Sequence, residues 1–205
     1  MNLTTILLIV LGYFIGSIPW ALVIGKVFYH TDVRTLGSHN LGGSNVYRTL
    51  GKVPGISVMV LDALKCLVYM IVLHFVNQDA AMPLAGLAVC IGHCYPVFAN
   101  FKGGKAVASS VGYVLAINLF IEKQLLIAWL IPMLVFLIIL KFDGRMAVSS
   151  ISVEALFSIT AWITYTSKFN ALLVTLLSVY VIYKHKANIQ RIMNGTEAKL
   201  KAAKK

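Results

Sequence analysis

Long apolar stretches separated by short polar ones constrain this chain more than any other feature of its sequence. Apolar residues make up 59% of the 205 positions, and the charged residues, 12% of the total, cluster in a few short segments. Soluble proteins hold about 45–50% apolar residues, and apolar runs of about 17–25 residues are long enough to cross a bilayer as helices. The sequence therefore predicts an all-α integral membrane protein.

The apolar stretches predict a bundle of seven membrane-spanning helices. The expected spans are Leu3–Val27, Val53–Val76, Met82–Phe98, Ala106–Ile121, Leu125–Leu140, Val148–Tyr165 and Phe169–Tyr183. The third and fourth are short and are joined only by residues 99–105, so a re-entrant pair is an alternative. Gly12 and Gly16 form a G-x-x-x-G step followed by Pro19, which favours close helix packing and a bend.

The basic residues indicate an orientation. With the amino terminus outside, fifteen of the 18 Lys and Arg residues fall in inner loops and the tail, whereas the outer loops hold only Lys123 and Lys168. Positive charge is retained on the cytoplasmic side, so the carboxyl terminus is expected there. The chain is expected to form one domain in the cell (plasma or inner) membrane, residues 1–205, with a basic tail at 194–205. Membrane lipid explains the net charge of +11 without nucleic acid.

The first expected inner loop has the composition of an anion site. It reads D-V-R-T-L-G-S-H-N-L-G-G-S-N-V-Y-R-T-L-G-K from Asp32 to Lys52 and has no acidic residue after Asp32. Glycines permit tight, positive-φ backbone that aims N–H groups at one ligand, and short polar side chains and bases add donors. These residues are Gly37, Ser38, Asn40, Gly42, Gly43, Ser44, Asn45, Arg48 and Lys52. Phosphate is the natural candidate; a flexible turn with positive-inside charges is the alternative for this loop alone.

Two further inner segments carry groups of the same kind. Residues 92–109 read G-H-C-Y-P-V-F-A-N-F-K-G-G-K-A-V-A-S, with Gly103 and Gly104 between Lys102 and Lys105 just before a helix. A helix start with free N–H groups attracts anions, although the spacing of a nucleotide-binding loop is absent. Past the last span, His185 and Asn188 share one helical face, and an imidazole can exchange a proton near neutral pH.

Three other groups have simpler interpretations. Asp62 and Lys65 are spaced to pair within the second span, which lowers the cost of burying either. His74 and Asp79 form an H-x-x-x-x-D sequence like that of thioester-dependent glycerolipid acyltransferases, but at the outer end of the second span, so we interpret this match as coincidence. Glu154 has no partner three or four residues away and is expected near the inner interface or protonated.

No metal site is expected. Cys90, His93 and Cys94 lack a fourth zinc ligand at a typical spacing. Core packing is the simpler interpretation of the cysteines.

Together the three inner segments resemble the bacterial acyl-phosphate:glycerol-3-phosphate acyltransferase family, over nearly the whole chain. Gly37–Arg48, which reads G-S-H-N-L-G-G-S-N-V-Y-R, is similar to the family signature G-S-G-N-x-G-A-T-N-x-x-R. Gly92–Ser109 is similar to G-H-x-x-P-V-F-x-x-F-K-G-G-K-G-V-A-T. The family's D-x-x-K appears as Asp62–Lys65, and its H-x-x-N-I-x-R as His185–Arg191.

The sequence departs from the family pattern in two ways. Several signature positions differ: His39 and Ala106 stand where the family usually has Gly, and Ser44 and Ser109 where it has Thr. Before the sixth span, R-Y-V-S-L-x-S-I becomes G-R-M-A-V-S-S-I, so that Ala147 takes the place of the first Ser. Ser149 or Ser150 is the alternative source of that hydroxyl.

The resemblance implies transfer of a fatty acyl group from acyl phosphate to the 1-hydroxyl of glycerol 3-phosphate, giving 1-acylglycerol 3-phosphate and phosphate in phospholipid synthesis. It implies no cofactor, and as partners the two substrates and the enzyme that produces acyl phosphate. Catalytic roles are expected for Ser38, Lys105, His185 and Asn188. Phosphate binding is expected of Arg48, Lys105, Asn40, Gly42, Gly43, Ser44, Asn45, Lys102, Gly103 and Gly104, and supporting roles of His93, Asp62 and Lys65.

Two other classes of protein stay open. A transporter of a phosphorylated metabolite can use basic, glycine-rich loops, but it needs polar groups at the midplane, whereas the bases of this chain stay at one face. An inactive descendant of the enzyme is suggested by Ala147 and His39. Acyl-transfer and flux assays separate these classes.

Overall fold

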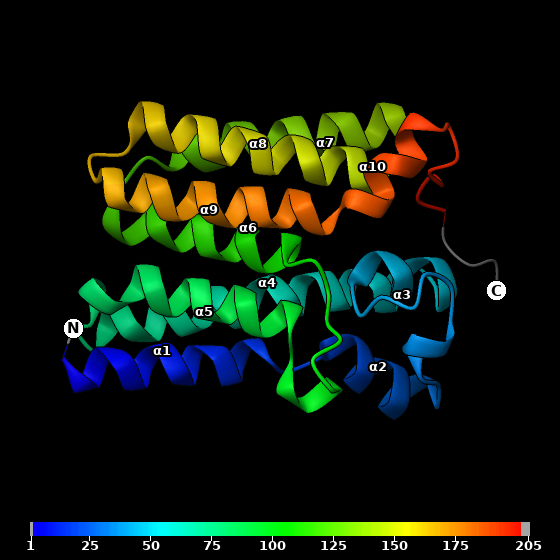
Figure 1. Ribbon diagram of the computed structural model, residues 1–205, viewed down its shortest axis with the longest axis horizontal. Coiled ribbons are helices and arrows are strands. Elements are labelled where there is room, and N and C mark those ends of the chain that lie inside the picture. Colours follow the sequence, from blue (N-terminus) through cyan, green and yellow to red (C-terminus); the bar gives the residue numbers. More distant parts are fainter. Residues whose placement is uncertain (1, 202–205) are drawn as a thin grey trace. The chain divides into compact units, whose positions relative to one another are not determined.

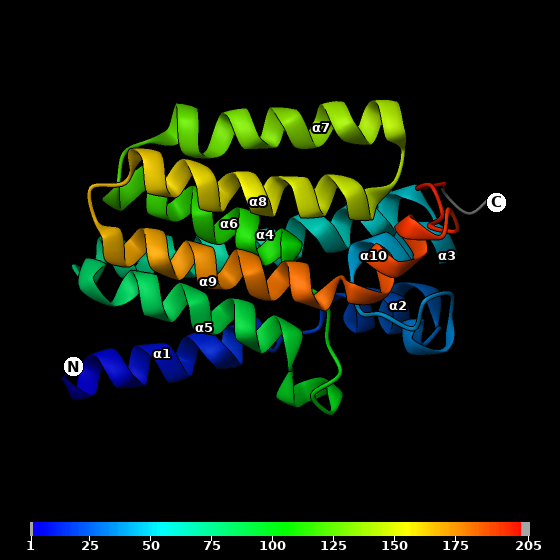
Figure 2. The same cartoon turned by 45° about the horizontal axis from the view of Figure 1, so that its top comes forward.

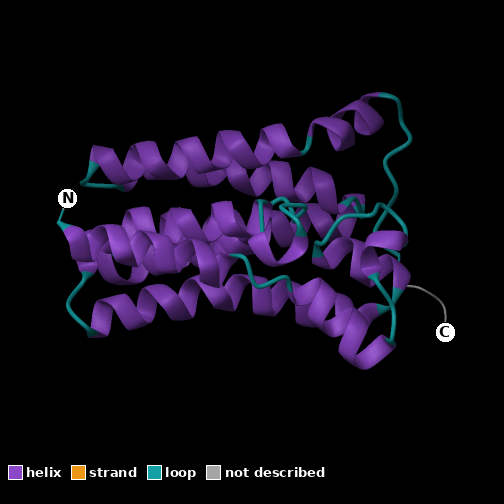
Figure 3. Cartoon of the chain, turned by 60° about the horizontal axis from the view of Figure 1, so that its bottom comes forward, coloured by secondary structure: helices purple, strands orange, loops and turns teal. Residues whose placement is uncertain are grey.

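The computed structural model describes residues 2–201, and all regular structure in that range is helical (Figure 3). Five apolar helical segments are long enough to cross a membrane: Leu3–Tyr29, Lys52–Phe75, Asp79–Ala99, Leu126–Asp143 and Met146–Thr164. They correspond to five of the seven expected spans. The other two fall on the shorter helices Val107–Ile121 and Lys168–Lys184, so the count of seven and the orientation stay predictions. Residues 202–205 of the expected tail lie outside the described residues.

The chain divides into two compact units, Met1–Tyr113 with Leu200–Lys205, and Val114–Lys199. The first contains α1 (Leu3–Gly16), α2 (Trp20–Tyr29), η1 (Val33–Thr35), α3 (Gly43–Thr49), α4 (Lys52–Phe75), η2 (Asp79–Ala81), α5 (Met82–Cys94) and η3 (Val97–Ala99). The second contains η4 (Ile117–Ile121), η5 (Leu126–Leu130), α7 (Ile131–Asp143), α8 (Met146–Thr164), α9 (Lys168–Lys184) and α10 (Lys186–Met193). The boundary falls within α6 (Val107–Ala116).

Glycines let α1 and α5 pack closely in the first unit (Figure 1). A Cβ on Gly12 would lie 2.5 Å from the carbonyl oxygen of Ala85, and a Cβ on Gly16 would lie 2.1 Å from that of Val89. This confirms the close packing expected of the G-x-x-x-G step. The expected bend is a complete break, since α1 ends at Gly16 and α2 begins after Pro19.

A small apolar core holds the polar loops of the first unit together. Its buried members are Ala21, Leu22, Ile24, Val33, Leu41, Val46, Val58 and Ala99. Leu41 and Val46 belong to the first signature segment, and Ala99 belongs to the second. Burial of these side chains in one cluster therefore brings two segments that are far apart in sequence to the same end of the first unit.

In the second unit, α8 packs between α7 and α9 (Figure 2). Glu154 lies near the middle of the 19-residue α8, away from both ends of that helix, and is 1% exposed. Its Oε2 accepts a hydrogen bond from Ser178 Oγ of α9 at 3.2 Å. The carboxyl group thus joins two helices inside the unit, where an unpaired polar group would be costly.

Candidate functional site

The first polar loop folds around the side chain of Asn45, which is 3% exposed. Its Oδ1 accepts a hydrogen bond from Ser38 N at 2.9 Å. Its Nδ2 donates to the carbonyl oxygens of Val33 (3.2 Å), Leu36 (3.1 Å) and Asn40 (3.1 Å). The donors and the acceptor of this amide therefore all serve the loop backbone. Asn45 therefore fixes the shape of the loop, and Ser38 is exposed on the loop surface.

The positive φ expected of three loop glycines occurs at only one of them. Gly37 has φ +56, whereas Gly42 is extended with φ −104 and Gly43 is the first residue of α3. Gly43 is required by close packing, because a Cβ there would lie 2.4 Å from Cγ of Met59 and 2.8 Å from the carbonyl oxygen of Gly55 in α4. Positive φ, which glycine permits at all three positions, is therefore not used at Gly42 or Gly43, and at Gly43 glycine serves the tight contact between α3 and α4.

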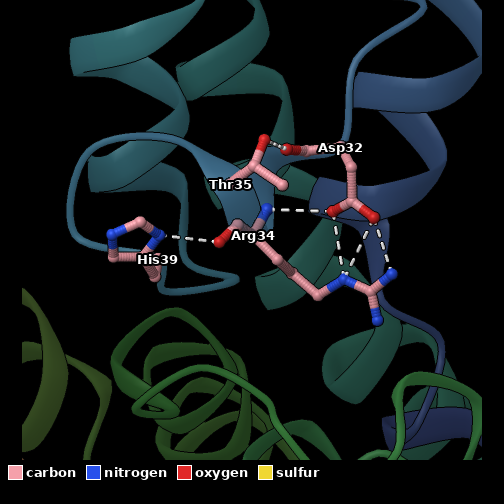
Figure 4. A network of polar contacts seen from close by, with 4 residues as sticks. All are labelled: Asp32, Arg34, Thr35 and His39. Atoms are coloured by element: carbon pink, nitrogen blue, oxygen red, sulfur yellow. Dashed lines mark hydrogen bonds and ion pairs between the residues drawn. The ribbon is translucent and has the colours of Figure 1, made fainter.

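Two departures from the family signature lie on left-handed backbone. His39 has φ +58 and Ala106 has φ +65, and both stand where the family usually has Gly. This conformation costs a residue with a Cβ roughly 1–2 kcal/mol. His39 offsets part of that cost, because its Nδ1 donates to the carbonyl oxygen of Arg34 at 2.7 Å (Figure 4). The left-handed positions explain why glycine is usual at these two places.

An ion pair closes the start of the first loop (Figure 4). Nε and Nη2 of Arg34 lie 3.0 Å and 2.6 Å from the two carboxylate oxygens of Asp32, and Arg34 N donates to Asp32 Oδ1 at 3.0 Å. These hydrogen bonds lower the pKa of Asp32 to about 2. The same D-x-R arrangement recurs at the turn between α7 and α8, where Arg145 pairs with Asp143 at 2.6 Å. Sequence reasoning missed both pairs, although the repeated spacing was visible.

The Gly103–Gly104 turn of the second signature segment lies directly against the end of α5. Gly104 N donates to the carbonyl oxygen of His93 at 3.1 Å. A Cβ on Gly103 would lie 2.1 Å from that oxygen, and a Cβ on Gly104 would lie 2.1 Å from Nε2 of the same His93. These glycines are needed for space beside His93. The turn leads to Lys105, which is half-buried just before α6.

Lys65 links Asp62 to His93 beneath this turn. Lys65 Nζ lies 2.9 Å from Asp62 Oδ1, 3.0 Å from His93 Nδ1 and 3.1 Å from the carbonyl oxygen of Ile18. An ammonium group has three donors and no acceptor, so each of its protons has an acceptor. The expected pairing of Asp62 with Lys65 is confirmed, and the contact with His93 explains how the pair supports the turn.

Asp62 and His93 also line a small pocket in the first unit. Its other lining residues are Gly16, Ile18, Pro19, Leu41, Pro96, Gly103 and Gly104, and its volume is about 10 Å³. This is room for about one water molecule and too little for a phosphate group.

The third signature segment lies in the second unit and is held by Glu197. Oε1 of Glu197 accepts from Nδ2 of Asn188 at 2.7 Å, and Oε2 accepts from Nε of Arg191 at 2.7 Å. Nδ1 of His185 donates to the carbonyl oxygen of Val181 at 2.8 Å, so a neutral ring carries its lone pair on Nε2. Sequence reasoning missed Glu197. The signal was present, because Glu197 is the only acidic residue after Glu154.

The hydroxyls beside Ala147 are used inside α8. Ser149 Oγ donates to the carbonyl oxygen of Arg145 at 3.4 Å, and Ser150 Oγ donates to that of Met146 at 2.8 Å. Both serines are buried, and Ala147 is 4% exposed. Each hydroxyl thus donates to a backbone carbonyl one turn back in the chain.

These features define an all-helical integral membrane protein with basic, glycine-rich loops gathered in one unit. A family model described as glycerol-3-phosphate acyltransferase matches residues 6–195, and the chain belongs to this family. It is 41% identical over 202 residues to a glycerol-3-phosphate acyltransferase of Bacillus cereus (strain G9842), and the matched residues cover 98% of each chain. It is 40% identical over 195 residues to the glycerol-3-phosphate acyltransferase of Bacillus subtilis (strain 168), and the matched residues cover 95% of this chain and 97% of the relative.

Solved structures agree with this assignment. The crystal structure of PlsY (YgiH), an integral membrane glycerol 3-phosphate acyltransferase, in its glycerol 3-phosphate form matches with a TM-score of 0.86 and 30% identity over 97% of this chain and 96% of that one. The lysophosphatidic acid form matches with a TM-score of 0.82 and 30% identity, over 96% and 95% of the two chains.

Proposed function

We propose that the protein transfers a fatty acyl group from acyl phosphate to the 1-hydroxyl of glycerol 3-phosphate. The observation that carries this proposal is the core shared by Leu41, Val46 and Ala99, because it joins the two signature segments that hold most of the proposed phosphate ligands. Membership of the glycerol-3-phosphate acyltransferase family supports the reaction class. The glycerol 3-phosphate and lysophosphatidic acid forms of the related PlsY support the acceptor and the product.

In the proposed reaction, the oxygen of the 1-hydroxyl attacks the acyl carbonyl carbon. A new ester C–O bond forms, the bond between that carbon and the phosphate oxygen breaks, and phosphate leaves with the electron pair. Acyl phosphate is already an activated mixed anhydride. Positioning of two anionic headgroups and stabilisation of the leaving phosphate are then sufficient, without a covalent intermediate on the protein.

Arg48 and Lys105 are the proposed main phosphate ligands. The proposed phosphate-binding cradle around them is formed by Ser38, Asn40 and Ser44 and by the backbone of Gly42, Gly43 and Gly103. A hydrogen bond to a charged group contributes about 1.5–3 kcal/mol. Replacing Lys105 or Arg48 by alanine should therefore lower kcat/KM roughly ten- to hundred-fold.

His185 is the proposed acceptor of the hydroxyl proton, and Asn188 is proposed to orient that hydroxyl. The bond from His185 Nδ1 to the Val181 carbonyl supports this role, because it directs the lone pair of the neutral ring to Nε2. The competing acceptor is the substrate phosphate itself. A His185→Gln variant that keeps full kcat across the pH range would assign the proton to the phosphate.

The decisive experiment uses the purified protein in lipid nanodiscs with acyl phosphate and labelled glycerol 3-phosphate. We expect labelled lysophosphatidate from acyl phosphate and none from acyl thioesters supplied in parallel. Product from thioesters alone would overturn acyl phosphate as the donor. Absence of product with every donor would overturn the acyltransferase assignment. His74→Ala and Asp79→Ala are matched controls, because these residues pair at 2.8 Å at the end of α4 opposite Lys52, and they should leave turnover unchanged.

We further propose that the amino terminus lies outside and that the site faces the cytoplasm of the cell membrane. Within the first unit, the start of α1 and the connection from α4 to α5 lie at one end, and the basic loop between α2 and α3 lies at the other (Figure 1). The positive-inside rule then supports this orientation. A membrane-impermeant maleimide should label Asn77→Cys in intact cells and Thr35→Cys only after permeabilisation. The reverse pattern would overturn the orientation.

A further inference from the structure

The second signature segment presents exposed aromatic rings beside a base. Tyr95, Phe98 and Phe101 are 43%, 60% and 57% exposed, and the neighbouring Lys102 is also exposed. Aromatic rings and lysines together are typical of the layer where a bilayer meets water, since the rings favour the lipid edge and the ammonium groups favour lipid phosphates.

The turn that presents these rings is internally hydrogen-bonded. The carbonyl oxygen of Pro96 accepts from the N–H groups of Ala99 at 3.0 Å and Phe101 at 2.9 Å, and Lys102 N donates to the Ala99 carbonyl at 3.2 Å. The hydroxyl of Tyr13 in α1 donates to the carbonyl oxygen of Tyr95 at 2.8 Å. Backbone that is satisfied in this way can enter the apolar edge of a bilayer, where unpaired polar groups are excluded.

The same turn contains two consecutive residues in left-handed backbone. Asn100 has φ +54 and Phe101 has φ +56. This conformation is unfavourable for a bulky residue such as Phe101, and strain of this kind is retained where the presented side chain has a use. In this turn, the strained residue carries one of the exposed rings.

The membrane-facing surface of α1 continues into this segment. Its most exposed apolar residues recur at helical spacing and are Leu3, Ile6, Leu7, Val10, Leu11 and Phe14, 45–70% exposed. α1 belongs to the apolar stretch Leu3–Tyr29, which is long enough to cross a membrane. The ring of Phe14 lies 6.3 Å from the ring of Phe98, measured between centroids. The apolar surface of α1 therefore runs without a gap onto the aromatic turn.

We propose that residues 95–102 form an interfacial anchor that inserts into the lipid bilayer. Phe98 and Phe101 lie among lipid chains at the edge of the hydrocarbon region, and Lys102 binds the phosphate of an anionic phospholipid. The anchor ends directly before Gly103, so its insertion holds the Gly103–Gly104 turn and Lys105 at the level of the lipid headgroups. This inference goes beyond the proposed reaction and does not depend on it.

The experiment measures the depth of spin labels in nanodiscs that contain phosphatidylcholine and phosphatidylglycerol. Single cysteines replace Phe98 or Phe101, and collision with oxygen is compared with collision with a water-soluble nickel chelate. Val10→Cys is the lipid reference and Thr35→Cys the water reference, since both residues are exposed in the first unit. The unsubstituted chain measures the background from Cys66, Cys90 and Cys94, all buried.

We expect labels at positions 98 and 101 to collide more with oxygen than with the chelate and to fall between the two references. Chelate accessibility equal to that at Thr35→Cys would overturn the anchor. Protection of these labels only after addition of another protein would also overturn it, because the aromatic turn would then be a protein-binding surface.

The contact of Lys102 with lipid has its own test. With the label at Phe101→Cys, a second substitution Lys102→Gln should increase chelate accessibility, and Lys102→Arg should leave it unchanged. Omitting phosphatidylglycerol should have the same effect as Lys102→Gln. Labels that respond to neither change would overturn the headgroup contact. Equal far-ultraviolet circular dichroism of all variants establishes that they are folded.

Discussion

Lys65 Nζ lies 3.0 Å from Nδ1 of His93. The two residues come from α4 and α5, and their contact is buried together with Asp62, whose Oδ1 lies 2.9 Å from the same ammonium group. The carbonyl oxygen of His93 in turn accepts from Gly104 N. A buried charge cluster in two helices thus supports the glycine turn that leads to Lys105.

Replacing Lys65 by methionine should destabilise the protein strongly, because Asp62 then keeps a buried charge without its cation. Loss of one partner of a buried ion pair costs about 3–5 kcal/mol. The double variant Asp62→Leu/Lys65→Met removes both charges and should recover most of that loss. Thermal unfolding in one detergent measures both effects. A single variant as stable as the parent would contradict the role of the cluster.

Replacing Asn45 by alanine should loosen the first loop. Four hydrogen bonds to the loop backbone are lost, and at about 1 kcal/mol each we expect a loss of roughly 2–4 kcal/mol of stability. The KM for glycerol 3-phosphate should rise, because Ser38 and Asn40 lose their support. Thr35→Ala is the control, since it removes one exposed hydrogen bond to Asp32, and it should change stability by less than about 0.5 kcal/mol.

The sequence predicts those parts of the fold and site that depend on local spacing. The five long apolar segments, the close packing at Gly12 and Gly16, and the pair Asp62–Lys65 all follow from periodicity or from residues three and four apart. The sharing of one core by both signature segments is a long-range outcome. It was suggested by the expected place of both segments on the inner side and by the resemblance to a family, and not by any local spacing.

What the sequence does not predict depends on tertiary contacts. Asn45 is indistinguishable from the other polar loop residues until the backbone closes around its amide. Gly43 and Gly104 appear as flexible glycines, but close packing requires them. Glu197 is nine residues from Asn188, a spacing with no helical meaning, so only the return of the chain after α10 brings the two together.

Glycine should stabilise the left-handed position 39 relative to alanine. At φ +58 a Cβ costs roughly 1–2 kcal/mol, and part of this is offset by the extra freedom of glycine in the unfolded chain. We therefore expect His39→Gly to be about 0.5–1 kcal/mol more stable than His39→Ala. At Lys123, which has φ +57, the glycine variant should likewise be more stable than the alanine variant.

Gln190 is the matched control for this comparison, because it lies in α10 with ordinary helical backbone. There the alanine variant should be the more stable one, by about 1 kcal/mol. Denaturant or thermal unfolding of the paired variants gives each difference directly. The same order of stability at all three positions would contradict the left-handed assignment.

Replacing Glu197 should affect turnover through Asn188. Glu197→Ala removes both hydrogen bonds of the carboxylate, and with Asn188 proposed to orient the attacking hydroxyl, kcat should fall roughly tenfold or more. Glu197→Gln keeps an oxygen that can accept from Asn188 and should retain much more activity. Thr196→Ala, beside it in an exposed turn, should be unaffected. Equal activity of the Ala and Gln variants would separate Glu197 from the positioning of Asn188.

The ion pair between Asp32 and Arg34 should make loop stability depend on pH in the acid range. The pKa of Asp32 is about 2 in the folded protein, against 3.8 for an unperturbed carboxyl. Between these values the unfolded chain binds more protons than the folded one, so acidification favours unfolding. The contribution is fully present above about pH 5 and disappears as the pH falls through about 2.

Because Asp32 is partly exposed, this pair should contribute about 1 kcal/mol or less. The measurement is the difference in unfolding free energy between the parent and Asp32→Asn across the acid range. That difference should be constant above about pH 5 and shrink toward zero near pH 2, because the protonated carboxyl then resembles the amide. A difference that persists or grows at pH 2 would contradict the ion pair as its source, because the protonated carboxyl no longer carries the charge that pairs with Arg34.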